Sequence, residues 1–147
     1  MNQLLLNELK NKLGLEVIKT SKIMTKKEIL IKMYQDNELE KEDVYKHQHY
    51  LIITRSGIEK IQAKNKINIS FNLEHIEKEL SVIKAIAIKE DEQIETYGSA
   101  SKETSHNKYY TEMAEKRSLS RAVLKIMGLY QHGVYGEDES DDFKRNK

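Results

Sequence analysis

Residues 67–97 read INISFNLEHIEKELSVIKAIAIKEDEQIETY, and this stretch decides the fold. Its beginning, INISFNL, alternates apolar and polar side chains, which is typical of a half-buried strand. The middle part, LSVIKAIAI, is apolar on both faces and predicts a more deeply buried strand. An acidic turn at Asp91–Glu92 precedes the last part. The sequence therefore predicts three consecutive strands, at residues 67–73, 80–88 and 93–97.

A long helix is predicted after these strands, over residues 108–127, and Gly128 ends it. Its apolar side chains recur at helical spacing and form one core face: Leu119, Ala122, Val123, Ile126 and Met127. A strand at 50–54 and a short helix at 57–64 come before the three strands. We therefore expect an α+β fold in which an antiparallel β-β-β meander is packed by a long C-terminal helix.

Two further helices are expected near the N-terminus. The first carries leucines between residues 4 and 13 and stops near Gly14. The second starts at Thr25, with Glu28 three residues later, which fits a capping box. The predicted organisation is an N-terminal helical segment (1–49), an α+β core (50–135) and an acidic flexible tail (136–147).

Composition excludes several classes of protein. The 147 residues include no cysteine, so disulfides and thiolate chemistry are absent. No apolar run approaches the roughly 20 residues that span a bilayer, so we expect a cytoplasmic protein without a membrane partner. No glycine-rich phosphate loop and no recognisable catalytic triad occur. We therefore expect a chain that is not an enzyme and needs no cofactor.

The long helix carries a stripe of positive charge. Arg117, Arg121 and Lys125 follow one another at intervals of four residues, and Lys116 lies beside them. This spacing sets charges about 6 Å apart along the helix, comparable to successive phosphates of a nucleic-acid strand. We expect the stripe to lie on an accessible face and to contact the phosphate backbone. The alternative is that these side chains only solvate an amphipathic helix.

Three tyrosines flank the polar segment 98–107, which is rich in turn-forming residues. Tyr97 precedes this segment, and Tyr109 and Tyr110 follow it at the start of the basic helix. Aromatic rings next to cations stack on the bases of single strands. We therefore add Tyr109 and Tyr110 to the predicted nucleic-acid-binding residues. The alternative is that the tyrosines anchor the loop to the core.

Two other features leave alternatives open. His47 and His49 would share one face of a strand and could chelate a metal, but two histidines without further ligands are usually surface residues, so no metal is expected. Residues 136–143 hold five acids and no base. This acidic run could solubilise the chain, hold a protein partner, or compete with nucleic acid for the basic helix.

The segment MAEKRSLSRAVLKIMGLY (113–130), followed by GEDESDDF (136–143), resembles the end of the Erf family of phage recombination proteins. The order of strands and helices is similar to the β-β-β-α core of the larger annealase superfamily, which includes Redβ, RecT and the Rad-fifty-two type. YLIITRSGIEKIQAKNKI (50–67) also resembles the segment that enters this core in several phage members.

This resemblance implies binding of single-stranded DNA and annealing of complementary strands without ATP, in phage-type homologous recombination. It implies a homo-oligomer, as a ring or filament, and a groove lined by Lys116, Arg117, Arg121 and Lys125. Self-association is also expected from the residues themselves, because both faces of the 80–88 strand are apolar. The alternative function is a non-catalytic structural, adaptor or inhibitor protein that reuses the same fold.

Overall fold

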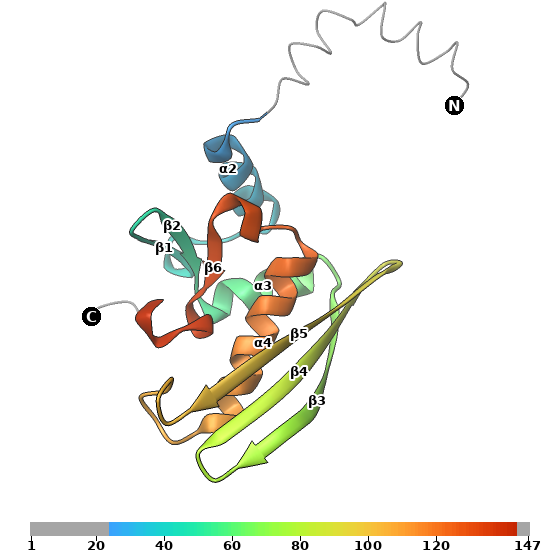
Figure 1. Cartoon of the computed structure of the whole chain (residues 1–147). Helices are drawn as coiled ribbons and strands as arrows, with labels where there is room; N and C mark the ends of the chain where they lie inside the picture. The colour runs from blue at the N-terminus through green and yellow to red at the C-terminus, as the bar shows by residue number, and fades with distance from the viewer. Residues whose placement is uncertain (1–23, 144–147) are drawn as a thin grey trace, which may run out of the picture. The chain divides into compact units, whose positions relative to one another are not determined.

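The computed structural model describes residues 24–143. By its internal contacts the chain divides into two units between Met33 and Tyr34. The leucine-rich helix expected at residues 4–13 lies outside the described residues. The elements, labelled in Figure 1, are α2 (Lys26–Asp36), η1 (Lys41–Asp43), β1 (Val44–His47), β2 (Tyr50–Ile53), α3 (Arg55–Lys64), β3 (Asn68–Glu77), β4 (Leu80–Lys89), β5 (Glu92–Ser101), α4 (Tyr110–Ile126), η2 (Tyr130–His132), β6 (Val134–Gly136), η3 (Glu137–Glu139) and η4 (Asp141–Phe143).

Helix α2 begins where its sequence predicts. The side-chain oxygen of Thr25 accepts a hydrogen bond of 3.2 Å from the backbone N–H of Glu28. This bond satisfies one of the amide groups that the first turn of a helix leaves without a partner. The expected start of the second helix at Thr25 is therefore confirmed.

The three predicted strands form one antiparallel sheet in the order β3-β4-β5. Helix α4 packs on one face of this sheet, chiefly over β4 and β5 (Figure 1). On that inner face β4 contributes buried Ser81, Ile83, Ala85 and Ala87, which alternate with less buried side chains on the outer face. The expected α+β fold, a β-β-β meander packed by a C-terminal helix, is confirmed.

Helix α4 approaches β5 closely because the facing side chains are small. A Cβ atom added to Gly98 would lie 2.3 Å from the backbone oxygen of Ala114 and 2.4 Å from the backbone nitrogen of Ser118. Two residues earlier, the hydroxyl of Thr96 donates a hydrogen bond of 2.8 Å to the carbonyl oxygen of Ser118. Glycine is therefore required at position 98, where strand and helix backbones almost touch.

Helix α4 is buried on two sides, which the single predicted core face does not describe. Ala122, Val123 and Ile126 are buried as expected, but Leu119 and Met127 are only partly buried. Leu124, which lay off the predicted face, is fully buried. The reason is that α4 contacts α3, β6 and η3 in addition to the sheet.

Strand β3 carries a row of apolar side chains that α4 leaves uncovered. Phe71 and Leu73 lie opposite Ala85 and Ile83 of β4, so they share its inner face. A bulge between Leu73 and His75 shifts the register, and Ile76 consequently returns to this face opposite Ser81. Leu73 and Ile76 remain 55% and 58% exposed.

A second, smaller sheet was not predicted from the sequence. It has the order β1-β2-β6, with β1 and β2 antiparallel and β2 and β6 parallel. Strand β1 (Val44–His47) lies within residues 1–49, which were expected to form an N-terminal helical segment, but it pairs with β2 of the core. Strand β6 brings the residues after α4 back to β2, and the acidic run follows it directly.

Candidate nucleic-acid interface

Arg117 is buried, with 4% of its surface exposed, so the expectation that it lies on an accessible face is wrong. Its guanidinium group donates hydrogen bonds to three carbonyl oxygens. The acceptors are Ser99 at 2.9 Å, Thr104 at 2.7 Å and Asp138 at 3.2 Å. A guanidinium group has five N–H donors, and this site gives most of them an acceptor.

The partners of Arg117 come from three separate parts of the chain. Ser99 belongs to β5, Thr104 to the turn that follows it, and Asp138 to η3. The carboxylate of Asp141 lies 3.6 Å from the guanidinium group and also accepts a hydrogen bond of 2.9 Å from the backbone N–H of His106. Arg117 therefore fastens this turn and the acidic run to α4.

This arrangement corrects the expectation of an acidic flexible tail from residue 136. Gly136 and Asp138 are buried, and the ring of Phe143 packs on that of Tyr135 with centroids 5.7 Å apart. Residues 136–143 thus belong to the packed structure. Their low apolar content did not reveal this, because backbone carbonyls and carboxylates provide most of the contacts.

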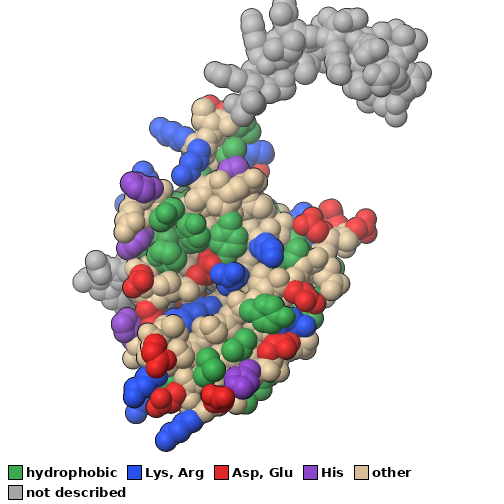
Figure 2. Space-filling view, in the orientation of Figure 1, with side chains coloured by type: hydrophobic (Ala, Val, Ile, Leu, Met, Phe, Trp, Pro, Cys, Tyr) green, Lys and Arg blue, Asp and Glu red, His purple; other side chains and the backbone are tan. Residues whose placement is uncertain are grey.

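The accessible part of the basic stripe consists of Arg121 and Lys125. Both residues are exposed, and the Arg121 side chain is 51% exposed. Lys125 makes no ion pair with any of residues 24–143, whereas Arg121 lies 3.8 Å from the carboxylate of Glu139. Lys116, at the other end, is partly buried. Figure 2 shows basic side chains over α4, between the two sheets.

A groove of about 250 Å³ opens beside Arg121, between β5 and the acidic run. Tyr97, Thr104 and Ser140 line it, with Glu139 at its side. Arg121, Thr104 and Ser140 bring guanidinium and hydroxyl groups to this space. Tyr97 is exposed and borders it from the outer face of β5, because its neighbours Thr96 and Gly98 face α4. Hydroxyl and guanidinium groups are suited to phosphate, and an aromatic ring is suited to a base. We call this space the α4 groove.

Glu139 is the acidic counterpart of Arg121 in the α4 groove. Its carboxylate accepts a hydrogen bond of 2.6 Å from the backbone N–H of Gly136 and another from the hydroxyl of Tyr130. Burial raises the pKa of Glu139 above its ordinary value, although these hydrogen bonds and the charge of Arg121 act in the opposite direction. The charge on Glu139 therefore controls how strongly Arg121 is paired.

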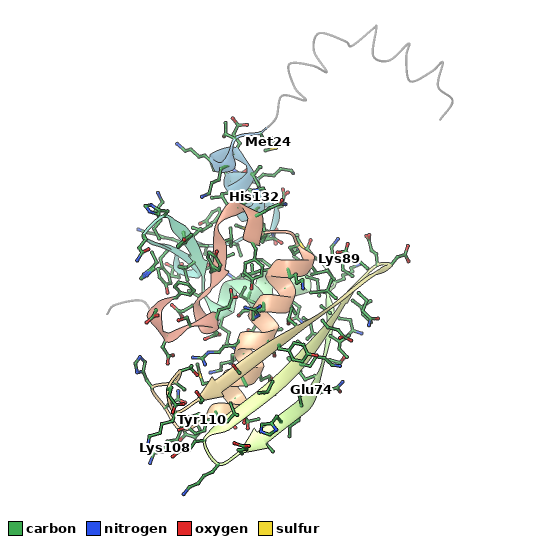
Figure 3. All side chains as sticks on the ribbon, in the orientation of Figure 1. Met24, Glu74, Lys89, Lys108, Tyr110 and His132 are labelled. Atoms are coloured by element: carbon green, nitrogen blue, oxygen red, sulfur yellow. The ribbon has the colours of Figure 1, made fainter. Side chains whose placement is uncertain are left out.

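The two tyrosines predicted to stack on bases lie in different surroundings. Tyr109 is 69% exposed and its backbone N–H is bonded to the side chain of Asn107 at 2.9 Å. Tyr110 instead packs against the buried cluster around Met113, at the N-terminal end of α4 (Figure 3). Tyr110 thus anchors the start of the helix, and Tyr97 is the tyrosine that lines the α4 groove together with Arg121.

The histidine pair that could have chelated a metal is divided by a turn. His47 ends β1, and His49 lies in the turn before β2. The ring of His47 packs edge-on against Phe143, with centroids 5.5 Å apart. Among residues 24–143, no three histidine or acidic side chains are grouped so that they could hold a metal ion. No helix within the same residues is long and apolar enough to cross a membrane.

Comparisons of the chain with models of protein families, with curated proteins and with solved structures found no match.

Proposed function

We propose that this chain binds single-stranded DNA along the α4 groove and promotes annealing of complementary strands without ATP. The observation that carries the proposal is the position of Arg121 and Lys125, one helical turn apart on the exposed part of α4, with Arg121 lining the α4 groove together with Tyr97. Two cations at this spacing match successive phosphates. The β-β-β-α arrangement agrees with the fold that the resemblance to phage annealing proteins implies.

The proposed contacts differ from those expected from the sequence. Arg117 is removed from the set, because its donors are already bound to carbonyl oxygens. Its buried charge still lines the groove, and its hydrogen bonds hold Thr104, another lining residue, in place. Arg121 and Lys125 are proposed to bind phosphates, and Tyr97 is proposed to stack on a base.

Titration of a labelled oligo-dT by fluorescence anisotropy at two salt concentrations tests binding. Mixing two complementary labelled oligonucleotides, with and without the protein and without ATP, tests annealing. We expect binding that weakens steeply with salt and annealing faster than the spontaneous rate. The proposal is abandoned if the protein neither binds oligo-dT at low salt nor speeds pairing.

We also propose that the chain self-associates through the uncovered face of β3. Phe71, Leu73 and Ile76 form an exposed apolar row on an edge strand. Edge strands with apolar faces are surfaces for pairing with another chain. Light scattering at tens of micromolar should give a mass above that of the 17.2 kDa monomer, and Leu73→Lys should lower it.

One observation favours the alternative, a non-catalytic adaptor or structural protein. Arg117 and Arg121 both face carboxylates of the acidic run, Asp141 and Glu139. On this alternative the basic residues serve to hold the acidic run, and Lys125 alone is left to attract phosphate. Wild-type protein that is folded and does not bind oligo-dT would support the alternative.

A further inference from the structure

We infer that the smaller sheet carries a second contact surface for single strands, an aromatic platform on which nucleobases stack. The platform consists of His47, Tyr50, Tyr135 and Phe143. This inference rests on the proposed function and extends it, because the α4 groove explains contacts to phosphates but offers only Tyr97 to the bases.

Four separate segments of the chain build the aromatic platform. His47 ends β1 and lies opposite Tyr50, the first residue of β2. Tyr135 is the middle residue of β6, and Phe143 ends η4. The rings are in contact: the centroids of Tyr50 and Tyr135 are 5.0 Å apart, and those of Tyr135 and Phe143 are 5.7 Å apart. The fold therefore gathers rings that the sequence keeps far apart.

The rings lie on the face of the smaller sheet that is turned away from α4. Ile53 pairs with Gly136, whose α-carbon lies against Ser120 of α4, so this pair marks the inner face. Tyr135 pairs with Ile52 and therefore shares the opposite face with it. Ile52 is completely buried, whereas all four rings are only partly buried. The rings thus lie on the outer face of the smaller sheet and remain partly exposed.

The aromatic platform continues into the α4 groove. The ring of Tyr130 lies 5.6 Å from that of Tyr135, and its hydroxyl is bonded to Glu139, which faces Arg121. Figure 2 shows hydrophobic side chains over β2 and β6 next to basic side chains over α4. A single strand has a charged backbone on one side and flat bases on the other, so it fits a line of cations beside a row of rings.

Charge and composition favour nucleobases over an apolar protein partner. The four members of the platform are aromatic, and Tyr130 and Glu139 connect Tyr135 to the exposed cation of Arg121, while Asp142 lies next to Phe143 on the other side. Aromatic rings beside cations are the arrangement that proteins use to bind single strands without sequence preference. An apolar partner helix would gain little from the cations, whereas single-stranded nucleic acid would contact the cations with its phosphates and the rings with its bases.

The test compares Tyr50→Leu with Tyr50→Phe, because leucine keeps the apolar contact but removes the ring, and phenylalanine keeps the ring. Each variant is titrated with oligo-dT and with an abasic oligonucleotide of the same length, at two salt concentrations. We expect Tyr50→Leu to bind oligo-dT at least fivefold more weakly than wild type, with an unchanged salt dependence. Its affinity for the abasic strand should equal that of wild type. Tyr50→Phe should bind both strands as wild type does.

A fluorescence measurement on Tyr97→Leu, which removes the tyrosine of the α4 groove, keeps the test decisive if Tyr50→Leu does not fold. The chain has eight tyrosines and no tryptophan, so its intrinsic fluorescence comes from tyrosine. Stacking should quench this emission on addition of oligo-dT but not of the abasic strand. If folded Tyr50→Leu binds oligo-dT like wild type while an Arg121→Ala/Lys125→Ala variant is weakened, the aromatic platform is wrong and the proposed function stands. If wild type binds neither strand, both are overturned.

Discussion

The guanidinium group of Arg117 lies 2.7 Å from the carbonyl oxygen of Thr104, and this bond joins the centre of α4 to the turn after β5. The same group holds the backbone of Asp138 on its other side. A charged group that satisfies backbone carbonyls inside a protein contributes to stability, because those carbonyls would otherwise be buried without a donor. Arg117 therefore holds in place the turn after β5 and the acidic run, two of the segments that line the α4 groove.

The first prediction is that Arg117→Ala destabilises the protein severely. The substitution leaves three carbonyl oxygens without their side-chain donor and removes the positive charge beside the carboxylate of Asp141. Removing one partner from a buried charged network costs about 3–5 kcal/mol. The free energy of unfolding, from urea denaturation, measures this loss. Arg121→Ala is the control: because its side chain is half exposed, the loss should stay below about 1 kcal/mol. Equal losses for the two variants would contradict the assignment.

The second prediction concerns the acidic run. Deleting residues 137–147 removes the contacts of Asp138, Glu139 and Asp141 and the ring of Phe143. We expect a clear fall in the melting temperature, because Arg117 then loses two of its partners inside the protein. Deleting only residues 144–147 removes none of these contacts and is the control. A long truncation as stable as the short one would restore the view of the run as a dispensable tail.

The large sheet and the long helix could be predicted because their signals are local. The alternation around Phe71 has the period of a strand, and the apolar spacing around Val123 has the period of a helix. Strands β3 and β5 each continue four residues past their predicted ends, and β4 continues one residue past its own. Strand β5 therefore includes the start of the segment 98–107, which was expected to be turn-rich. A local sequence pattern predicts the presence of a helix or strand more accurately than it predicts the residues at which that element begins and ends.

The smaller sheet and the role of Arg117 could not be predicted because they depend on distant partners. Strand β6 is only Val134–Gly136, and it pairs with β2 from a position more than 80 residues earlier. The sequence shows that Arg117 is charged but not that carbonyl oxygens surround it. The four-residue spacing predicted that Arg117 and Lys125 lie in one exposed stripe. Because α4 is buried on two sides, Arg117 is buried and Lys125 is exposed.

The third prediction is that Gly98→Ala disrupts the contact between β5 and α4. The new Cβ would meet backbone atoms of Ala114 and Ser118 at 2.3 and 2.4 Å, and neither can rotate away. Overpacking of this kind costs about 1–3 kcal/mol, and backbone contact places the expected loss at the upper end. Thermal unfolding measures it. Ser99→Ala, on the exposed side of the same strand, should leave the melting temperature nearly unchanged. A well-tolerated alanine at position 98 would mean that strand and helix lie further apart.

The fourth prediction is a pH dependence that Glu139 introduces. Because burial raises its pKa in the folded protein above the ordinary value of 4.5, the folded state binds this proton more readily than the unfolded state. The ionised carboxylate therefore costs stability above the folded-state pKa, and this cost disappears as the pH falls through that pKa toward 4.5. Glu139→Gln removes the titrating group.

We therefore expect the melting temperature of wild type to rise relative to that of Glu139→Gln as the pH is lowered from about 8 to about 5. Glu115→Gln, at an exposed position of α4, controls for the general change in charge. A difference between wild type and Glu139→Gln that is constant over this range would show that Glu139 does not titrate as its burial implies.

The last prediction concerns the two accessible cations of α4. Each phosphate neutralised on a single strand contributes about −0.7 to the slope of log affinity against log salt. Arg121→Ala/Lys125→Ala should therefore weaken binding to oligo-dT and make the slope about 1.4 less steep, the sum of two such contributions. Neither side chain is buried, and alanine favours a helix, so the melting temperature should change little. Lys64→Ala/Lys66→Ala, which also removes two exposed positive charges but lies at the end of α3, is the matched control and should keep the wild-type slope. If both double variants flatten the slope equally, the chain attracts nucleic acid through its general charge and α4 does not form a binding site.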